Sequence, residues 1–554
     1  MNERELGLTL TSRKPLDSGN LLSHCVAAAE KSRLENCNMK APPDSMIVSG
    51  SISSGTESEC RNTLIFVSWV VILLAFDLLT LRSFPVPWSD ETLFADPAAS
   101  VVLNKHWTST IWNGRGDFIF WGGNVPAYSA LLVPWLWLWG VSAAAVRSLN
   151  CILVALTMIC TWFSVKRLQL VPRPEIRLAT LIALSLCYPV SYCVRCGRPD
   201  VLGMLIFSAG ALFWADSRIT NARRGLFFCA ALIPFAGLQY AFYLPVLLGV
   251  LFWAGGRSAL NRIVAIISGG LFGSALLFIY YQCFAGWDGL LASMADVHGR
   301  RPHGLWNSFA DLMTHQIFLY YFGRPHFVLL IAAVVWLTAS WRHLTGAGRR
   351  SLMLASIMLL VPGVIVGFFS HFMAPYHWLA VAPAMILLSS VICGSWKNFG
   401  PATKVFCALL ILGLALSGRI VFVSLGLGLG SASYTTQIEI AAIGLIQPGE
   451  NVFVDPQLYY AVKPRAGQIY YAEIVPRLTK SEKESVSVAF LCSADPAFGE
   501  KWFMNAFGGH WTLVADLPIP CAQVDHQPAA SRLLSWFHAG NFVGRPLSVY
   551  RRDR

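Results

Sequence analysis

Long apolar stretches, repeated along the chain, constrain the fold of this protein more than any other feature. The first is NTLIFVSWVVILLAFDLLTL, from Asn62 to Leu81, and similar stretches follow it almost to residue 430. Only 13% of the 554 residues are charged, about half the share in a soluble protein. A helix of about 20 apolar residues crosses the hydrocarbon core of a membrane. The sequence therefore predicts a mostly α-helical, polytopic membrane protein.

The basic residues are distributed in a way that fits a membrane protein. The net charge of +12 would suggest a nucleic-acid partner in a soluble chain. Here the basic residues cluster between apolar stretches, at Lys166-Arg167 and in WRHLTGAGRR. Such clusters are typical of cytoplasmic loops, and they also attract lipid phosphates. We expect membrane lipids, and no nucleic acid, among the partners.

The same basic residues predict the orientation of the chain. Arg61 precedes the first stretch, which places the N-terminus inside and lets Ser83 emerge outside. The segment Asn124–Gly140 is short and contains prolines, and we interpret it as a juxtamembrane helix on the outer surface. Counted as a span, it would put Lys166 and Arg167 outside. This scheme gives about eleven spans with the C-terminal part outside.

The composition divides the chain into three regions. Residues 1–60 are polar and aperiodic, which predicts a disordered cytoplasmic leader. Residues 61–428 form the membrane part, in which the stretch from Gly225 to Trp253 is interrupted near Gly237. Residues 429–554 predict a small extracytoplasmic α/β domain, with strands in ENVFVDPQLYYAV and SVSVAFLCSADP and an amphipathic helix in PAASRLLSWFHA. Cys492 and Cys521 in this domain either pair or remain free.

Ionisable side chains gather in four predicted outer loops, where they could build one site. The first loop contains Asp90, Glu91, Asp96 and Asp117, the second Arg195, Arg198 and Asp200, the third Asp288, Asp296, His298, Arg300, Arg301, His303 and His315, and the fourth His371, Tyr376 and His377.

Carboxylates beside basic groups at a membrane surface suit a lipid-linked phosphate as substrate. Arginine binds phosphate oxygens with two parallel hydrogen bonds. A carboxylate can accept a proton from an acceptor hydroxyl as a general base. It can also hold a divalent metal that neutralises a leaving phosphate.

Each of these features also has a purely structural interpretation. Asp90 and Glu91 could form the first turn of a helix, where negative charge is favourable. Arg198 and Asp200 could form a salt bridge that closes a tight turn. Asp77 lies within the first apolar stretch, where a charge is costly, and it either reaches the interface or is functional.

The order of the motifs resembles the GT-C superfamily of membrane glycosyltransferases, specifically the bacterial group near protein O-mannosyltransferases and the aminoarabinose transferase of lipid A. The resemblance covers about Asn62 to Leu427 and rests on SDETLFADPAASVVLNKHW, VPAYSALLVPWLWLWGVSAAAVRSLN, RCGRPDVLGML and APYHWLAVAPAMILL. It implies a GT-C-like membrane core in a bacterial-type inner membrane. It also implies a sugar donor carried on a polyprenyl phosphate, an inverting reaction, and a lipid, glycan or protein acceptor.

The resemblance also assigns roles to residues. Asp90 would be the general base or a metal-linked carboxylate beside Glu91, and Asp200 a second acidic residue of the site. Arg198 would contact the donor phosphate. The remaining residues expected to bind substrate are Arg147, Arg195, His298, Arg300, Arg301, His303, Tyr376 and His377.

The sequence leaves open both a metal ion and an alternative function. Asp90 and Glu91 could hold Mg²⁺ or Mn²⁺. A transporter or flippase of lipid-linked or anionic solutes is the alternative function. Such a protein would show ionisable residues at mid-bilayer and helix breaks in paired positions.

Overall fold

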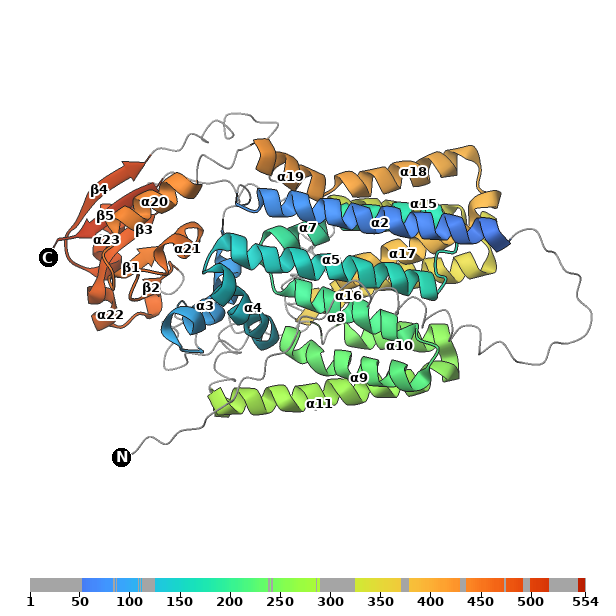
Figure 1. The fold of residues 1–554 in the computed structure, drawn as a ribbon, viewed down its shortest axis with the longest axis horizontal. Helices are drawn as coiled ribbons and strands as arrows, with labels where there is room; N and C mark the ends of the chain where they lie inside the picture. Colours follow the sequence, from blue (N-terminus) through green and yellow to red (C-terminus); the bar gives the residue numbers. More distant parts are fainter. Residues whose placement is uncertain are drawn as a thin grey trace, which may run out of the picture. The chain divides into compact units, whose positions relative to one another are not determined.

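Helices make up most of the described chain, and a small sheet domain follows them (Figure 1). The computed structural model describes residues 52–82, 85, 87–107, 109, 111, 125–237, 240, 243–284, 286–288, 324–369, 378–428, 435–472, 475–491, 499–517 and 547–553. Ser58–Arg554 form one compact unit. Most of the predicted leader lies outside the described residues, and helix α2 begins within it, at Ile52.

The helical part has the following bounds. In the N-terminal half, the helices are α2 Ile52–Thr80, α3 Ser89–Asn104, α4 Pro126–Trp139, α5 Ala143–Arg167, α6 Pro174–Leu186, α7 Tyr188–Arg195, α8 Asp200–Trp214, α9 Ile219–Ala236, α10 Leu244–Gly255 and α11 Leu260–Phe284. They are followed by α15 Pro325–Ala339, α16 Gly346–Phe369, α17 Trp378–Ser395, α18 Pro401–Leu416 and α19 Arg419–Gly428. Short 3-10 turns occur at η2 Gly256–Ala259, η3 Trp341–His343 and η4 Trp396–Asn398.

Several of these helices are long and apolar enough to cross a membrane. Within the described ranges there are five, or six if the bent pair α6 and α7 makes one span. They are Glu57–Thr80, Ala143–Arg167, Leu260–Phe284, Trp378–Asn398 and Pro401–Ser424. Shorter apolar helices occur at Asp200–Trp214, Leu244–Trp253 and Pro325–Ala339. The protein is therefore a multi-pass membrane protein, and the count of about eleven spans stays a prediction.

Two breaks interrupt the helical segments. The predicted interruption near Gly237 is confirmed, because α9 ends at Ala236 and α10 begins at Leu244. The bend of 44° between α6 and α7 was not predicted. It occurs at Cys187, two residues before Pro189, whose ring cannot continue the preceding helix.

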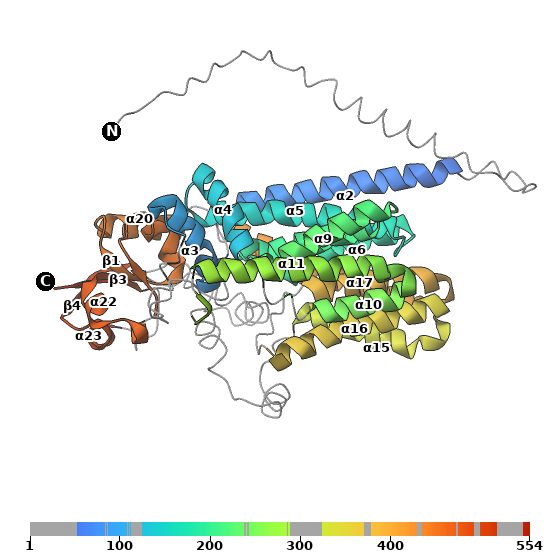
Figure 2. The same cartoon turned by 90° about the horizontal axis from the view of Figure 1, so that it is seen from below.

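Helices α2 and α5 lie side by side (Figures 1 and 2). The Phe66 ring stacks on Trp162, with ring centroids 4.7 Å apart. The shorter helices α3 and α4 lie at one end of the bundle. In α4, Trp137 and Trp139 are 71% and 67% exposed, as expected for side chains that anchor a helix at a membrane surface.

The C-terminal part is a mixed five-stranded sheet with the strand order β2-β1-β3-β5-β4. Strand β1 pairs in parallel with β2 and β3, whereas β5 pairs antiparallel with β3 and β4. Both predicted strands are confirmed, as β1 and β3. The predicted amphipathic helix, Cys492 and Cys521 lie outside the described residues. The elements are α20 Thr435–Leu445, β1 Asn451–Val454, η5 Pro456–Leu458, α21 Tyr459–Val462, β2 Ile469–Tyr470, η6 Val475–Arg477, α22 Lys480–Ser485, β3 Val486–Leu491, α23 Glu500–Phe507, β4 Trp511–Leu517 and β5 Leu547–Arg552.

Candidate active site

Asp90 and Glu91 occupy the first turn of α3. The predicted helix start is therefore confirmed, and the unpaired backbone N–H groups there favour negative charge. Adjacent helical residues point about 100° apart, so the two carboxylates enter different surroundings. The Asp90 side chain is 41% exposed, whereas that of Glu91 is fully buried.

Arg198 lies between two carboxylates. Its Nη1 is 2.5 Å from Oδ2 of Asp90, and its Nε is 2.7 Å from Oδ2 of Asp200. The guanidinium also lies over the rings of Trp88 and Phe94, at 5.7 and 5.6 Å from their centroids. The predicted salt bridge with Asp200 is thus present, and it extends to Asp90. Only Asp90 of the three charged groups is substantially exposed.

Buried polar groups hold the turn that carries Arg198. The Nδ2 amide of Asn150 in α5 donates to the backbone oxygens of Cys193 and Arg198, at 3.1 and 3.0 Å. Tyr128 of α4 donates to Oδ1 of Asn150 at 2.9 Å. Gly197 has a φ of +57°, and a Cβ there would lie 2.5 Å from Cγ of Glu91. The turn thus packs directly on the start of α3.

Glu91 forms a buried ion pair with Arg147 of α5. The contacts join Nε to Oε1 at 2.9 Å and Nη2 to Oε2 at 2.7 Å. Nη1 of Arg147 donates to the backbone oxygens of Leu81 and Pro85, at 2.9 and 2.7 Å. Burial raises the pKa of the Glu91 carboxyl, and the charge of Arg147 opposes that shift. This pair connects the end of the first span to α3 and α5.

The Asp90–Glu91 pair does not fit a shared divalent metal. Each carboxylate faces its own guanidinium, Arg198 for Asp90 and Arg147 for Glu91. A cation placed between them would lie close to both positive charges. Within the part of the chain that the structure describes, no group of three His, Cys, Asp or Glu side chains could hold a metal.

Arg195 belongs to a deeper cluster that sequence reasoning missed. Its Nη2 lies 2.8 Å from Oδ1 of Asp77, and Arg419 of α19 bonds to Oδ2 of the same carboxylate. Asp77 and Arg195 are fully buried, and Arg419 is 4% exposed. Asp77 and Arg195 are therefore both buried inside the protein and paired with each other. One feature of the sequence could have predicted this ion pair. Asp77 and Arg419 carry opposite charges, and both lie within or beside apolar stretches.

Asp96 is also buried, and it faces the C-terminal domain. Its Oδ1 lies 2.9 Å from Nζ of Lys463 and accepts from the hydroxyl of Tyr459. Sequence reasoning grouped Asp96 with the site and did not identify either partner. Since neither is near α3 in the sequence, no local signal pointed to them.

The remaining predicted site residues cannot be placed. They lie outside the described residues and are His298, Arg300, Arg301, His303, Tyr376 and His377, together with Asp117, Asp296, His315 and His371.

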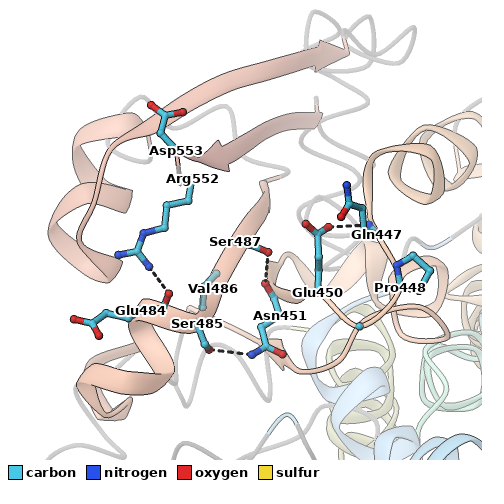
Figure 3. A pocket seen from close by; sticks show the side chains of 11 residues that line it. Gln447, Pro448, Glu450, Asn451, Glu484, Ser485, Val486, Ser487, Arg552 and Asp553 are labelled. Carbon is cyan, nitrogen blue, oxygen red and sulfur yellow. Dashed lines mark hydrogen bonds between the residues drawn. The ribbon is translucent and has the colours of Figure 1, made fainter.

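A separate polar hollow of about 550 Å³ lies in the sheet domain. Figure 3 shows Asn451, Ser485 and Arg552 among the side chains that line it. Several of these groups bond to one another or to backbone, such as Asn451 Nδ2 to Ser485 Oγ at 3.0 Å and Arg552 Nη1 to Glu484 O at 2.6 Å. None of the predicted site residues that the structure describes lines it.

Comparison with solved structures defines the class of fold. The crystal structure of ArnT from Cupriavidus metallidurans bound to undecaprenyl phosphate matches with a TM-score of 0.54 and 13% identity, over 88% of this chain and 97% of that chain. The chain therefore shares the fold of that ArnT structure. The predicted GT-C-like core is supported at the level of the fold.

Two further similar structures are glycosyltransferases. The arabinofuranosyltransferase AftD from Mycobacteria matches with a TM-score of 0.44 and 13% identity, over 88% of this chain and 40% of that chain. The oligosaccharyltransferase of Archaeoglobus fulgidus, tethered to an acceptor peptide, matches with a TM-score of 0.43 and 10% identity, over 77% of this chain and 69% of that chain. No protein-family model matches the sequence, and no curated protein matches it.

Proposed function

We propose that the protein is an inverting glycosyltransferase. It moves a sugar from a polyprenyl-phosphate donor to an acceptor hydroxyl at the outer face of the cytoplasmic membrane. The observation that carries this proposal is the half-exposed Asp90 carboxylate at the start of α3, bonded to Arg198, which in turn bonds to Asp200. The GT-C fold, shared with a protein crystallised with undecaprenyl phosphate, supports the choice of donor.

Asp90 is the general base in this reaction. Its carboxylate accepts the proton of the acceptor hydroxyl as the acceptor oxygen attacks the anomeric carbon. The attack comes from the face opposite the leaving group, so the configuration inverts. The bond between the anomeric carbon and the phosphate oxygen breaks, and the phosphate leaves with the electron pair. Because a phosphate is a good leaving group, the site needs no general acid to protonate it.

Arg198 supplies positive charge for the donor phosphate. The Arg198 side chain is 9% exposed, and its guanidinium lies over two aromatic rings, which restricts its orientation. Asp200, bonded to Nε, positions the guanidinium and does not itself contact the substrate. A guanidinium that is oriented before the substrate binds stabilises charge on the leaving phosphate without reorganisation.

The transporter alternative has less support. It predicts ionisable groups inside the membrane that can bind and release a solute. The intramembrane cluster of Asp77, Arg195 and Arg419 consists of ion pairs between buried side chains. The half-exposed charge is instead Asp90, outside the first span.

The test compares Asp90→Asn with Asp216→Asn, a carboxylate-to-amide control that bonds to the backbone N–H of Arg218. Each purified protein is reconstituted with a set of polyprenyl-phosphate sugars and acceptor extracts, and mass spectrometry measures free polyprenyl phosphate. We expect Asp90→Asn to lower turnover by about 100-fold or more, and Asp216→Asn to keep it. Full activity in Asp90→Asn would contradict the assignment of Asp90 as the general base. EDTA in parallel reactions tests whether Mg²⁺ or Mn²⁺ is required.

A further inference from the structure

One face of α3 contacts the C-terminal domain along its length. Thr92, Asp96 and Ser100 are spaced four residues apart, which places them on one side of a helix. The hydroxyl of Tyr471 donates to Oγ1 of Thr92 at 2.8 Å. Nζ of Lys463 lies 2.9 Å from Oδ1 of Asp96 and 3.4 Å from Oγ of Ser100.

The ion pair between Asp96 and Lys463, in the middle of this face, joins α3, the C-terminal domain and the segment around Ser109 and Ile111. Asp96 is fully buried, and Lys463 is 4% exposed. The second carboxylate oxygen of Asp96 accepts from Oγ of Ser109 at 3.0 Å and from the backbone N–H of Ile111 at 3.2 Å. Removing Lys463 would take away an ammonium group that neutralises a buried carboxylate, which is strongly unfavourable. Docking of the domain on α3 is thus coupled to this pair.

The charges of the Glu91–Arg147 pair act on α21, the short helix that ends just before Lys463. Tyr460 of α21 is 5% exposed, and its hydroxyl has no hydrogen-bond partner among the described residues. Burial and the charge of Glu91 raise the pKa of Tyr460, while Arg147 lowers it. The electrostatic influence of Glu91, the residue next to Asp90, thus extends into the domain that contacts the face centred on Asp96.

The faces of α3 have different partners. Glu91 bonds to Arg147 of α5, Asp90 bonds to Arg198, and the face centred on Asp96 bonds to the C-terminal domain. A helix held on several sides can neither rotate nor slide without breaking a buried polar contact. The direction of Asp90 at the start of α3 depends on that rotation.

We propose that the C-terminal domain is a positioning element for the site, and that Lys463 is the residue through which it fixes the rotation of α3. Lys463 acts through Asp96 and does not touch the reacting atoms. This inference rests on the proposed function, because it assigns the domain a part in aligning Asp90 with the acceptor. A misplacement of about 1 Å lowers turnover by about 100-fold.

The test uses the full-length protein in detergent or nanodiscs and compares Lys463→Met with Arg551→Met. The control removes an ion pair within the domain, from Arg551 Nη1 to Glu450 Oε1 at 2.8 Å. Hydrogen–deuterium exchange is followed for the amides of α3. We expect exchange there to rise about 10-fold or more in Lys463→Met and to stay unchanged in Arg551→Met. This arm requires no enzymatic activity.

The kinetic arm measures sugar transfer by the same variants. We expect Lys463→Met to lower kcat by about 10- to 100-fold with less than about a 3-fold change in KM for the donor. Lys463→Arg, which keeps the charge, should recover part of the loss. If Lys463→Met does not fold, Tyr471→Phe, which removes the bond to Thr92 at nearly constant volume, is judged by the same two criteria.

Two outcomes would overturn the inference. One is unchanged exchange in α3 when the ion pair is removed, because the domain would then not hold the helix. The other is faster exchange in α3 with unchanged kcat, because the rotation of α3 would then not matter to the reaction. If the wild-type protein transfers no sugar, the proposed function fails, and the exchange arm alone decides whether the domain holds α3.

Discussion

Arg147 binds both carboxylate oxygens of Glu91, at 2.9 and 2.7 Å. Both side chains are at most 1% exposed, although Glu91 directly follows the half-exposed Asp90. Two adjacent carboxylates therefore have different roles. Glu91 neutralises a buried guanidinium and attaches α3 to α5, whereas Asp90 remains accessible to a substrate.

This difference predicts that removing the two charges lowers stability by very different amounts. Glu91→Gln leaves Arg147 buried without a counter-ion, so we expect a loss of about 3–5 kcal/mol in stability. Asp90→Asn affects a half-exposed ion pair and should cost less than about 1 kcal/mol. Thermal unfolding in detergent measures both, with Glu500→Gln as a surface control. Equal shifts of the unfolding midpoint for the two variants would contradict the assigned roles.

Gly197 permits the close approach of the Arg198 turn to Glu91. Gly197→Ala adds a Cβ at a φ of +57° and 2.5 Å from Cγ of Glu91, so it meets both backbone strain and a clash. Gly256→Ala, at a φ of +54° with no atom within 4 Å, meets the strain alone. We expect Gly256→Ala to cost about 1–3 kcal/mol from backbone strain alone, because its φ of +54° and ψ of −143° lie in a region that side chains rarely adopt, and Gly197→Ala to cost more. The comparison of unfolding midpoints and sugar transfer tests this, and equal effects would exclude a role for the contact with Glu91.

The cluster of Asp77, Arg195 and Arg419 joins one carboxylate to two guanidinium groups inside the helical part. Asp77→Asn removes the buried carboxylate that bonds to both guanidinium groups, and we expect a loss of about 3–5 kcal/mol. Arg419→Met leaves the pair of Asp77 and Arg195 intact and should cost about half as much or less. The yield of folded protein and the thermal unfolding midpoint in detergent measure which variant loses more stability. A larger loss in Arg419→Met than in Asp77→Asn would mean that Arg419 is the main partner of Asp77.

The buried tyrosines of α21 predict a loss of stability in alkali. Burial raises the pKa of Tyr459 and Tyr460 well above 10.0 in the folded protein. Above about pH 10 the unfolded chain releases these protons while the folded chain retains them. Stability therefore falls with rising pH, by about 1.4 kcal/mol per pH unit for each tyrosine.

Tyr460→Phe tests this pH dependence with little effect on the stability of the protein near neutral pH. Its hydroxyl lacks a hydrogen-bond partner among the described residues, so its loss should be neutral or stabilising near neutral pH. We expect the variant to lose less stability than the wild type between about pH 10 and 11. Thermal unfolding across this range is the measurement. Identical slopes for both proteins would show that Tyr460 does not contribute.

Local sequence patterns predicted the helical membrane part well. All of the first apolar stretch except its last residue lies within α2, the acidic first turn begins α3, and both predicted strands occur in the sheet. These features depend on neighbouring residues, whose spacing the sequence displays directly. The bend of 44° after Leu186 was missed, because a single proline can begin a helix as well as interrupt one.

The roles of the charged residues depended on partners far apart in the chain. Asp90 and Arg198 are separated by 108 residues, and Asp96 and Tyr459 by 363. The sequence placed Asp90, Glu91 and Asp96 together as one acidic group with no basis for separating them. The three carboxylates differ in burial, and burial depends on which helix or domain covers each side of α3.

The sequence by itself therefore determined that the chain is a helical membrane protein with an acidic helix start after its first span. The length of an apolar stretch and the charge in the first turn of a helix are local properties, and they can be recognised without knowledge of the packing. Only the tertiary structure decided that Asp90 is accessible, that Glu91 pairs with Arg147, and that Asp96 faces the C-terminal domain. Side-chain exposure and ion pairing arise when distant segments pack, because packing removes water from a charge and supplies its partner.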